Sequence, residues 1–340
     1  MEQLLDVPAS RAARLREIVA RLCAASNVVL TTHVNADGDG TGTEAAVAAW
    51  LESVGVGVTI VNPTPFPPNL RFLAHRPDLI QDLPGEGAQR ALREADLFLV
   101  LDTSEPNRVQ PLLEHLDPDR TLVIDHHPAG PSVVGWGVQD PTAAAAGELA
   151  FDLIRLAGDS FPPAAVLGIY VAIVSDTGSF RFSNTTPRTH LIAADMLSRG
   201  VDPEYVFQKL YATFPRRRLD LLREALATLE TDPDLGISWM VIPQEVAERL
   251  EATSEDFDGL IDHARAIEGT RVAILFRETP DGETKISLRS SGGADVNQIA
   301  RAFGGGGHVK ASGALIPTPA AEAVPLVLEM VRESLEKLAE

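Results

Sequence analysis

The sequence predicts an α/β protein in which a doubly wound, mainly parallel sheet forms an N-terminal domain and a smaller α/β domain follows it, with a cleft between them. Three observations support this prediction. Short β-branched segments alternate with helical segments at the start of the chain, as in parallel sheets covered by helices on both faces. The 340 residues suffice for two hydrophobic cores. From residue 237 onward the strands follow one another more closely.

The N-terminal domain is predicted to span residues 1–190. Its first helix is expected at 10–25, because Leu, Ile and Val recur there at helical spacing between Arg and Glu. The Pro-rich segment 62–68 is expected to be a loop. Further strands are predicted at 27–32, 55–61, 95–101 and 121–124, and further helices at 41–53, 142–157 and 162–174.

The C-terminal domain is predicted to span residues 236–340 and to follow a helical connector at 191–235. Breaks at 200–203 and 214–218 interrupt the helical pattern of this connector. Strands are expected at 237–242, 271–276 and 284–289, and a helix at 297–303. The last two strands are predicted to form a hairpin across Pro280-Asp281-Gly282.

Composition excludes several classes of function. The net charge is −19, with 48 acidic against 29 basic residues, so a protein that coats long duplex nucleic acid is not expected. One cysteine, Cys23, excludes a disulfide framework and a cysteine zinc site. The start lacks the layout of a signal peptide, and no apolar run is long enough to span a membrane. We therefore expect a soluble, cytoplasmic protein with no membrane partner.

Carboxylates and imidazoles follow several of the predicted strands and one helix. Since the carboxyl ends of parallel strands share one edge of a sheet, these groups can converge there. Taken singly, each could be a turn residue or a helix cap. Together they indicate a metal site, because converging carboxylates repel one another without cations. The residues are His33, Asp37, Asp39, Asp102, Asp125, His126, His127 and Asp176.

The ligand types indicate which metal is expected. Carboxylate and imidazole without thiolate suit Mn²⁺, with Mg²⁺, Co²⁺ or Fe²⁺ as substitutes. The ligands suffice for two ions. A pair about 3.5–4 Å apart, bridged by a carboxylate and a water that becomes hydroxide near neutral pH, is a common device for phosphoester hydrolysis.

Four consecutive glycines, residues 304–307, form the second feature. They could be a flexible hinge or a backbone nest that presents N–H groups to an anion. The flanking residues favour the nest, because they form a compact cationic and donor-rich site that suits a phosphate or nucleotide. These residues are Arg289, Ser290, Asn297, Gly305, Gly306, Gly307, His308, Lys310 and Ser312.

These motifs resemble those of the DHH phosphoesterase superfamily, and residues 304–313 resemble the signature of its DHH-associated C-terminal domain. The similarity covers nearly the whole chain and is greatest to the two-domain oligoribonuclease and pAp-phosphatase branch, which is called NrnA-like. It implies one Mn²⁺ on His33, Asp37 and Asp102. It implies a second on Asp39, Asp102, His126 and Asp176, with Asp102, and in one arrangement Asp176, bridging the two ions.

The resemblance also implies roles for the remaining residues. His127 would face the scissile phosphate and stabilise it or protonate the leaving oxygen. Asp125 would orient a histidine rather than bind metal. The second domain would close over a catalytic cleft and hold the nucleotide through Arg289, His308 and the glycine loop. Three residues after the last motif are expected near the substrate: Arg181, Asn184 and Thr185.

The expected substrates are short RNA, released as 5′-mononucleotides, and 3′-phosphoadenosine 5′-phosphate (pAp), converted to AMP. The chain could also form a homodimer. One alternative is hydrolysis of a cyclic dinucleotide or its linear form pApA, for which the same metals would serve. Another is a non-catalytic nucleotide- or RNA-binding module, which loss of metal ligands would indicate. All the ligands are present.

Overall fold

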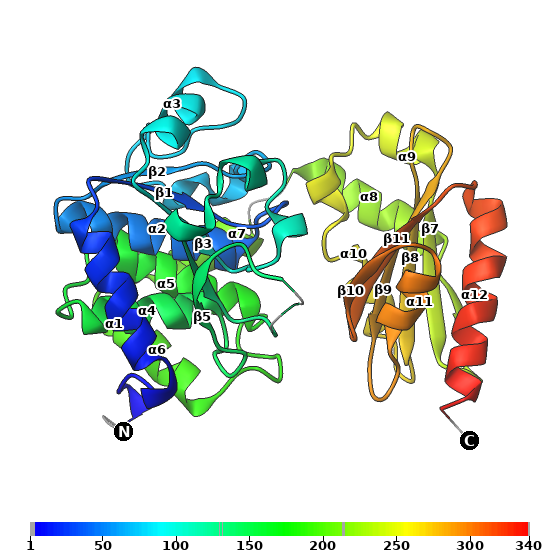
Figure 1. Ribbon diagram of the computed structural model, residues 1–340. Helices are drawn as coiled ribbons and strands as arrows, with labels where there is room; N and C mark the ends of the chain where they lie inside the picture. Colours follow the sequence, from blue (N-terminus) through cyan, green and yellow to red (C-terminus); the bar gives the residue numbers. More distant parts are fainter. Residues whose placement is uncertain (1–3, 129, 131, 213–214, 339–340) are drawn as a thin grey trace. The chain divides into compact units, whose positions relative to one another are not determined.

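The structure is a computed structural model that describes residues 4–128, 130, 132–212 and 215–338. The chain divides into two compact units, Met1–Thr213 and Phe214–Glu340. Figure 1 shows a separate sheet in each unit. Residues 213 and 214, where the sequence predicts a helix break, lie outside the described residues. None of the described helices has the length and apolar character needed to cross a bilayer.

The first unit contains a five-stranded sheet in which all neighbouring strands are parallel, as predicted. In chain order the strands are β1 (Asn27–Thr31), β2 (Gly57–Ile60), β3 (Leu97–Leu101), β4 (Thr121–Asp125) and β5 (Trp136–Gln139), and their order across the sheet is β2-β1-β3-β4-β5. The sequence analysis did not find β5, because its four residues include a glycine and a glutamine.

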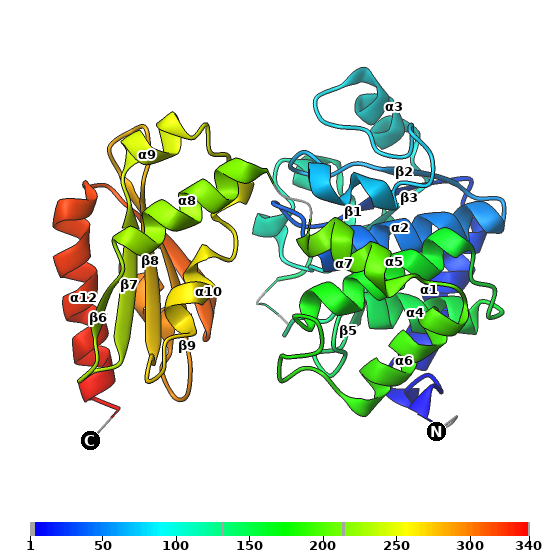
Figure 2. The same cartoon turned by 180° about the vertical axis from the view of Figure 1, so that it is seen from behind.

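The two faces of this sheet are covered unequally. Val28 and Leu30 of β1 pack into the larger core, whereas Val29 packs into the smaller core, as the two-residue period of a strand requires. Helices cover the larger core (Figure 2): α1 (Ala9–Ala24), α2 (Gly38–Ser53), α4 (Ala146–Leu156), α5 (Pro163–Asp176), α6 (Pro187–Ser198) and α7 (Pro203–Tyr211). Among the described residues, α3 (Glu86–Glu94), 3-10 turns near Val109 and Leu112, and the loop residue Val134 pack on the smaller core.

Helices α2 and α5 approach each other through glycine. A Cβ atom added at Gly42 would lie 2.6 Å from the carbonyl oxygen of Gly168, and one added at Gly168 would lie 2.4 Å from that of Gly42. At the end of the same contact, a Cβ atom at Gly38 would lie 2.2 Å from Oγ of Ser175. The two helices are therefore in main-chain contact at Gly42 and Gly168, and the start of α2 packs against the side chain of Ser175 near the end of α5.

The second unit contains a six-stranded sheet in the order β10-β11-β9-β8-β7-β6. Strands β7 (Ile237–Ile242) and β8 (Val272–Glu278) are parallel, and the remaining pairs are antiparallel, including the predicted hairpin of β8 with β9 (Thr284–Ser290). The sequence analysis did not find the short or glycine-containing strands: β6 (Glu230–Asp232), β10 (Gly306–His308) and β11 (Ala311–Ile316).

Helices cover both faces of this second sheet. Helices α11 (Val296–Ala302) and α12 (Ala320–Glu336) pack on one face, whose core contains Ile286 and Leu288. Helices α8 (Arg216–Ala227) and α10 (Leu260–Arg265) pack on the other face, whose core contains Ala273 and Leu275. The short α9 (Gln244–Arg249) follows β7.

Candidate metal centre

Six of the predicted metal ligands lie together at the carboxyl edge of the first sheet. His33 follows β1, Asp102 follows β3 and His126 follows β4. Helix ends supply the others, because Asp37 and Asp39 lie at the start of α2 and Asp176 is the last residue of α5. Segments far apart in sequence thus meet where parallel strands end, which is the usual position of a site in an open α/β sheet.

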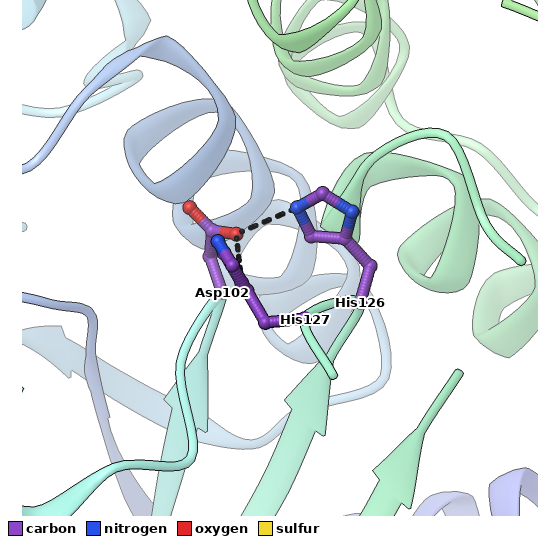
Figure 3. A group of neighbouring side chains, drawn as sticks. All are labelled: Asp102, His126 and His127. Carbon is purple, nitrogen blue, oxygen red and sulfur yellow. Dashed lines mark ion pairs between the residues drawn. The ribbon is translucent and has the colours of Figure 1, made fainter. Parts of the chain in front are cut away.

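Asp102 lies at the centre of this group. Its Oδ2 is 3.3 Å from Nε2 of His33, and its Oδ1 is 3.3 Å from Nε2 of His126 and 3.7 Å from Nδ1 of His127. Figure 3 shows both imidazole rings directed at the same carboxylate oxygen. Asp102 has a φ of 60°, a left-handed conformation that few residues other than glycine adopt and that Asp and Asn tolerate best.

The candidate ligand atoms fall into three overlapping groups, one of which is Asp102, His126 and His127, and the other two form separate sets. His33, Asp37 and Asp102 offer atoms that all lie within 4.8 Å of one another, and Asp39, His126 and Asp176 do the same. Asp102 contacts a histidine of each set, which places its carboxylate between them. The geometry therefore brings together the two ligand groups that the family resemblance implies.

The start of α2 and the start of α4 fix the two acidic residues of the first motif. Asp37 caps α2, and its Oδ1 accepts from the backbone N–H groups of Asp39 and Gly40 at 3.0 and 3.2 Å. The carboxylate of Asp39 accepts from the backbone N–H groups of Ala146 and Gly147 at 2.7 and 2.9 Å. The first turn of α4 thus orients Asp39, and its helix dipole favours the negative charge.

The three residues at the end of β4, Asp125, His126 and His127, make different contacts. Asp125, the last residue of β4, accepts from both the backbone N–H and Nδ1 of His127, at 3.0 and 2.8 Å. Nε2 of His126 lies 3.5 Å from Asp39 and 3.8 Å from Asp176. Asp125 is therefore placed to orient His127, while His126 faces the second ligand set.

Asp176 is held by the loop that follows it. The side-chain amide of Asn184 donates to Oδ2 of Asp176 at 3.0 Å, and also to the carbonyl oxygens of Asp176 and Ala144. Gly178, Ser179 and Phe180 all have positive φ, so this loop turns tightly in the left-handed region.

The other two residues predicted in this loop have different surroundings. Nε of Arg181 donates to the carbonyl oxygen of Gly178 at 2.6 Å, which folds this side chain back onto the loop. The backbone N–H of Thr185 donates to Phe182, and its Oγ1 is buried without a hydrogen-bond partner among the described residues.

Burial makes the charge of the site costly without cations. Burial and the neighbouring Asp102 raise the pKa of Asp39 well above its usual range, and burial raises that of Asp176 to about 6. Burial would lower the pKa of His33 and His126, but interactions with Asp102 and other carboxylates raise both to about 10. Burial would raise the pKa of Asp102, but His126 and His33 hold it below its usual range.

These observations fit divalent metal ions. Oδ2 of Asp125 is buried without a hydrogen-bond partner among the described residues, and Oδ1 of Asp102 is buried with ion-pair contacts to His126 and His127 but no hydrogen bond among those residues, although a buried oxygen normally has one. The donors are carboxylate oxygens and imidazole nitrogens, which suit Mn²⁺, Mg²⁺ and similar ions. A cation at Asp102 would satisfy its buried oxygen and offset the repulsion between carboxylates.

The residues predicted to bind substrate in the second unit lie on two faces of its sheet. Arg289 lies on the α10 face of β9, since its neighbours Leu288 and Ser290 point the other way into the core. Ser290 and Ser312 lie on the α11 face, where Nδ2 of Asn297 is 3.4 Å from Oγ of Ser312. The single compact site expected from the sequence is therefore divided by the two-residue alternation of the strands.

The glycine segment ends a helix and begins a strand. The N–H of Gly305 donates to the carbonyl oxygen of Ala300 and that of Gly304 to the carbonyl oxygen of Arg301, so both amides have acceptors within the unit. Gly306 and Gly307 lie in β10, which pairs with β11, and Asn297 bonds the carbonyl oxygen of Gly307. The side chain of His308 lies outside the described part of the structure.

Two further predicted residues also make internal contacts. Nζ of Lys310 donates to the carbonyl oxygens of Gly292 and Ala294. Oγ of Ser290 donates to Ala294 as well, at 2.8 Å. Both side chains thus hold the loop that joins β9 to α11.

The sequence analysis missed residues that support the site. Nδ2 of Asn62 donates to Oε2 of the fully buried Glu44 at 3.0 Å, and Oδ1 of Asn62 accepts from the backbone N–H of Thr32 at 3.1 Å. This chain of bonds fixes the end of β1 beside His33. No sequence signal indicated it, because Glu44 lies in an otherwise apolar helix and Asn62 in a loop.

The fold and the site define a phosphoesterase of the DHH family, and the chain belongs to that family. Residues 27–173 match the DHH family N-terminal domain and residues 241–337 match the DHHA1 domain. The chain is 32% identical over 317 residues to the bifunctional oligoribonuclease and PAP phosphatase NrnA of Thermus thermophilus, covering 91% of this chain and 90% of that one. A protein of the same name from Bacillus subtilis is 26% identical over 303 residues, covering 88% of this chain and 92% of its own.

Solved structures have the same fold. An exopolyphosphatase-related protein from Bacteroides fragilis superposes with a TM-score of 0.91 at 26% identity, covering 98% of this chain and 99% of that chain. RecJ of Thermus thermophilus in complex with Mn²⁺ superposes with a TM-score of 0.54 at 18% identity, over 98% of this chain and 56% of RecJ. At that identity the second similarity shows the fold alone.

Proposed function

We propose that this enzyme is a Mn²⁺-dependent phosphoesterase that hydrolyses short oligoribonucleotides to 5′-mononucleotides and pAp to AMP. The observation that carries the proposal is the position of Asp102 between the two ligand sets. The names of the Thermus and Bacillus relatives support the substrate class. We assign one ion to His33, Asp37 and Asp102, and a second to Asp39, Asp102, His126 and Asp176.

When bound, two divalent ions would neutralise charge on the phosphoryl oxygens and lower the pKa of the attacking water. The residues of the chain would hold these ions and the substrate in place. Asp125 keeps the ring of His127 in one orientation through the bond at Nδ1. We assign to Nε2 of His127 the contact with the scissile phosphate, where it would stabilise charge or donate a proton to the leaving oxygen.

The second unit is proposed to hold the rest of the nucleotide. Arg289 is the first candidate, because a guanidinium group pairs well with phosphate. His308 and the glycine segment remain candidates on the strength of the DHHA1 match at residues 241–337.

Hydrolysis of pApA or a cyclic dinucleotide is the second candidate function. A specific observation favours it, since the chain is 27% identical over 272 residues to the cyclic-di-AMP phosphodiesterase PdeA of Listeria monocytogenes. That match covers 74% of this chain but only 38% of PdeA, so much of PdeA has no counterpart in the match.

A substrate panel tests both candidates. Initial rates with Mn²⁺ are compared on pAp, RNA of two to five residues, pApA, cyclic di-AMP and pyrophosphate. We expect the highest kcat/KM on short RNA and pAp, and no hydrolysis by His126→Ala. A preference for cyclic di-AMP or pApA would favour the second candidate, and no hydrolysis of any of these would refute the metal-dependent mechanism.

A further inference from the structure

One short segment of main chain holds two carboxylates of the second ligand set, which consists of Asp39, His126 and Asp176. Asp39 accepts hydrogen bonds from two backbone N–H groups of residues 144–147, at 2.7 and 2.9 Å. The side-chain amide of Asn184 bonds Asp176 and also a carbonyl oxygen of the same residues. The support segment (residues 144–147) therefore contributes to the positions of both carboxylates.

The support segment has no polar side chain that could fix it. Its sequence is Ala144-Ala145-Ala146-Gly147, so its polar groups all belong to the main chain. Ala145 is the N-cap of α4 and makes no side-chain capping bond. Asp39 takes the place of a capping residue, because it accepts from N–H groups of the first turn that have no partner within the helix. The position of the segment must therefore come from contacts with other parts of the fold.

Glu148 provides such a contact. This buried residue is the third of α4, and its Oε2 accepts from the backbone N–H of Ala144 at 3.1 Å. Its Oε1 accepts from the guanidinium groups of Arg11 and Arg188 at 2.6 and 2.7 Å. One carboxylate thus joins the support segment to α1 and α6, which both pack against α4 (Figure 2).

Arg11 ties both ends of the loop that contains the support segment. Its side chain is only 2% exposed and bonds Asp140, the residue after β5, at 3.0 Å. The same guanidinium bonds Glu148 and Asp152 of α4 at 2.6 and 2.7 Å. Because breaking a buried ion pair is strongly unfavourable, this network resists displacement of the loop between β5 and α4.

The first ligand set has other supports. Nδ1 of His33 lies 2.8 Å from the carbonyl oxygen of Val34, and Asp37 caps α2. Within the described ranges, no hydrogen bond joins His33 or Asp37 to the support segment. A change in the support segment should therefore affect an ion held by the second ligand set more than an ion held by the first.

We propose that Glu148 is a positioning residue for the second ligand set and acts through the support segment on Asp39 and Asp176. Its described side-chain partners are the support segment and two arginines rather than a candidate ligand, so it is not expected to bind the ion itself. This inference rests on the proposed function, because it concerns the second of the two proposed Mn²⁺ ions.

Calorimetric titration of the full chain with Mn²⁺ tests this role without catalysis. Both oxygens of the Glu148 carboxylate accept hydrogen bonds, whereas an amide has one acceptor oxygen, so Glu148→Gln must lose a bond. Groups that orient a metal ligand typically contribute about 10–100-fold to metal affinity. We expect Glu148→Gln to bind one Mn²⁺ more weakly by about that factor, and the other as the native protein does.

Asp152→Asn is the matched control. Asp152 is buried on the same helix and accepts from the same two arginines at 2.7 and 2.5 Å. No hydrogen bond among the described residues joins its side chain to the support segment. We expect Asp152→Asn to lower stability and to leave both Mn²⁺ affinities unchanged, which separates positioning from a general loss of stability.

Two further measurements make the test independent of a single variant. In His126→Ala, which lacks a ligand of the second set, adding Glu148→Gln should cause no further loss of Mn²⁺ affinity. Gly147→Ala should weaken the same ion as Glu148→Gln without removing an ion pair, because its Cβ atom would lie 2.4 Å from Cβ of Ala172 and displace the support segment. This variant decides the question if circular dichroism shows that Glu148→Gln is unfolded.

The outcomes separate the role of Glu148 from the function on which it rests. Native Mn²⁺ affinities in Glu148→Gln and Gly147→Ala, equal weakening of both ions, or an equal loss in Asp152→Asn would overturn the positioning role. If the native protein also hydrolyses RNA with Mn²⁺, the proposed function stands without it. If the native protein binds two ions, needs Glu148 for one of them and hydrolyses no substrate, the positioning role stands and the proposed function falls. Fewer than two bound ions in the native protein would contradict both.

Discussion

The side-chain amide of Asn184 donates a 3.0 Å hydrogen bond to the carboxylate of Asp176, eight residues earlier in the chain. The same nitrogen bonds the carbonyl oxygens of Asp176 and Ala144, so one amide joins the end of α5 to the segment before α4. The sequence analysis placed Asn184 near the substrate. Its observed contacts favour a role in positioning Asp176.

Asn184→Ala tests this positioning role. Groups that orient a metal ligand typically contribute 10–100-fold to metal affinity or activity, so we expect Mn²⁺ affinity to fall by about that range. The measurement is activity and calorimetry against Mn²⁺ concentration. Saturating Mn²⁺ should restore most of the rate, whereas a higher KM at an unchanged Mn²⁺ requirement would indicate substrate contact instead.

The conformation of Asp102 gives a second prediction. Asp102→Asn and Asp102→Ala should both reduce bound metal and hydrolysis to background, because each removes the shared carboxylate. Ala is also strained at a φ of 60°, so Asp102→Ala should be less stable than Asp102→Asn by about 1–2 kcal/mol. Metal content and urea unfolding measure the two effects, and equal stability would mean that the backbone relaxes at this position.

His127 and His126 are expected to differ in what their loss removes. His127→Asn should lower kcat by about 10²–10⁴-fold, the usual contribution of a general acid, and leave metal content unchanged. His126→Ala should lower metal content as well. The comparison requires metal analysis and kinetics on the same preparations, and loss of metal from His127→Asn would contradict its assignment to the phosphate.

Glu44 predicts a dependence of stability on pH. Burial raises its pKa to about 8 despite the bond from Asn62, so the folded state retains a proton that the unfolded chain loses near pH 4.5. Its contribution is complete below pH 4.5 and is lost as the pH rises to about 8. In urea unfolding at pH 8.5, Glu44→Gln should therefore be more stable than the native protein by on the order of a few kcal/mol. At pH 4.5 the two proteins should have nearly the same stability. Glu17→Gln, on the exposed face of α1, is the control.

A buried network of ion pairs, which joins α4 to α1 and α6, gives the last prediction. Arg11 and Arg188 bond Glu148 and Asp152 at 2.5–2.7 Å, and Glu148 also accepts from the backbone N–H of Ala144. Arg11→Met should cost about 3–5 kcal/mol, because it leaves buried carboxylates with one partner fewer. The exposed Arg16→Met on the same helix should change stability by about 0.5 kcal/mol or less. Similar losses in both would show that the network contributes nothing specific.

The parallel sheet, and the edge of it at which the candidate metal ligands converge, could be predicted from the sequence. Apolar runs such as Leu97–Leu101 identify strands, and the acidic or imidazole residue after each run marks the shared edge. The sequence analysis did not predict which side chains of β9 and β11 lie on the same face of the sheet. Strand β11 was not found, and adjacent residues of β9, such as Arg289 and Ser290, point to opposite faces. The contacts of Asn184 and Asn62 depend on tertiary structure, which a single polar residue in a loop does not reveal.

The glycine contact between α2 and α5 has a consequence for the spacing of two candidate metal ligands. Asp39 lies three residues before Gly42, and Asp176 lies eight residues after Gly168. The close approach of the two helices at these glycines therefore contributes to the spacing of the two carboxylates, because a Cβ atom at either position would meet the main chain of the other helix. We expect that a methyl group at either glycine would push the two helices apart and so change the distance between Asp39 and Asp176, although neither glycine is a candidate ligand.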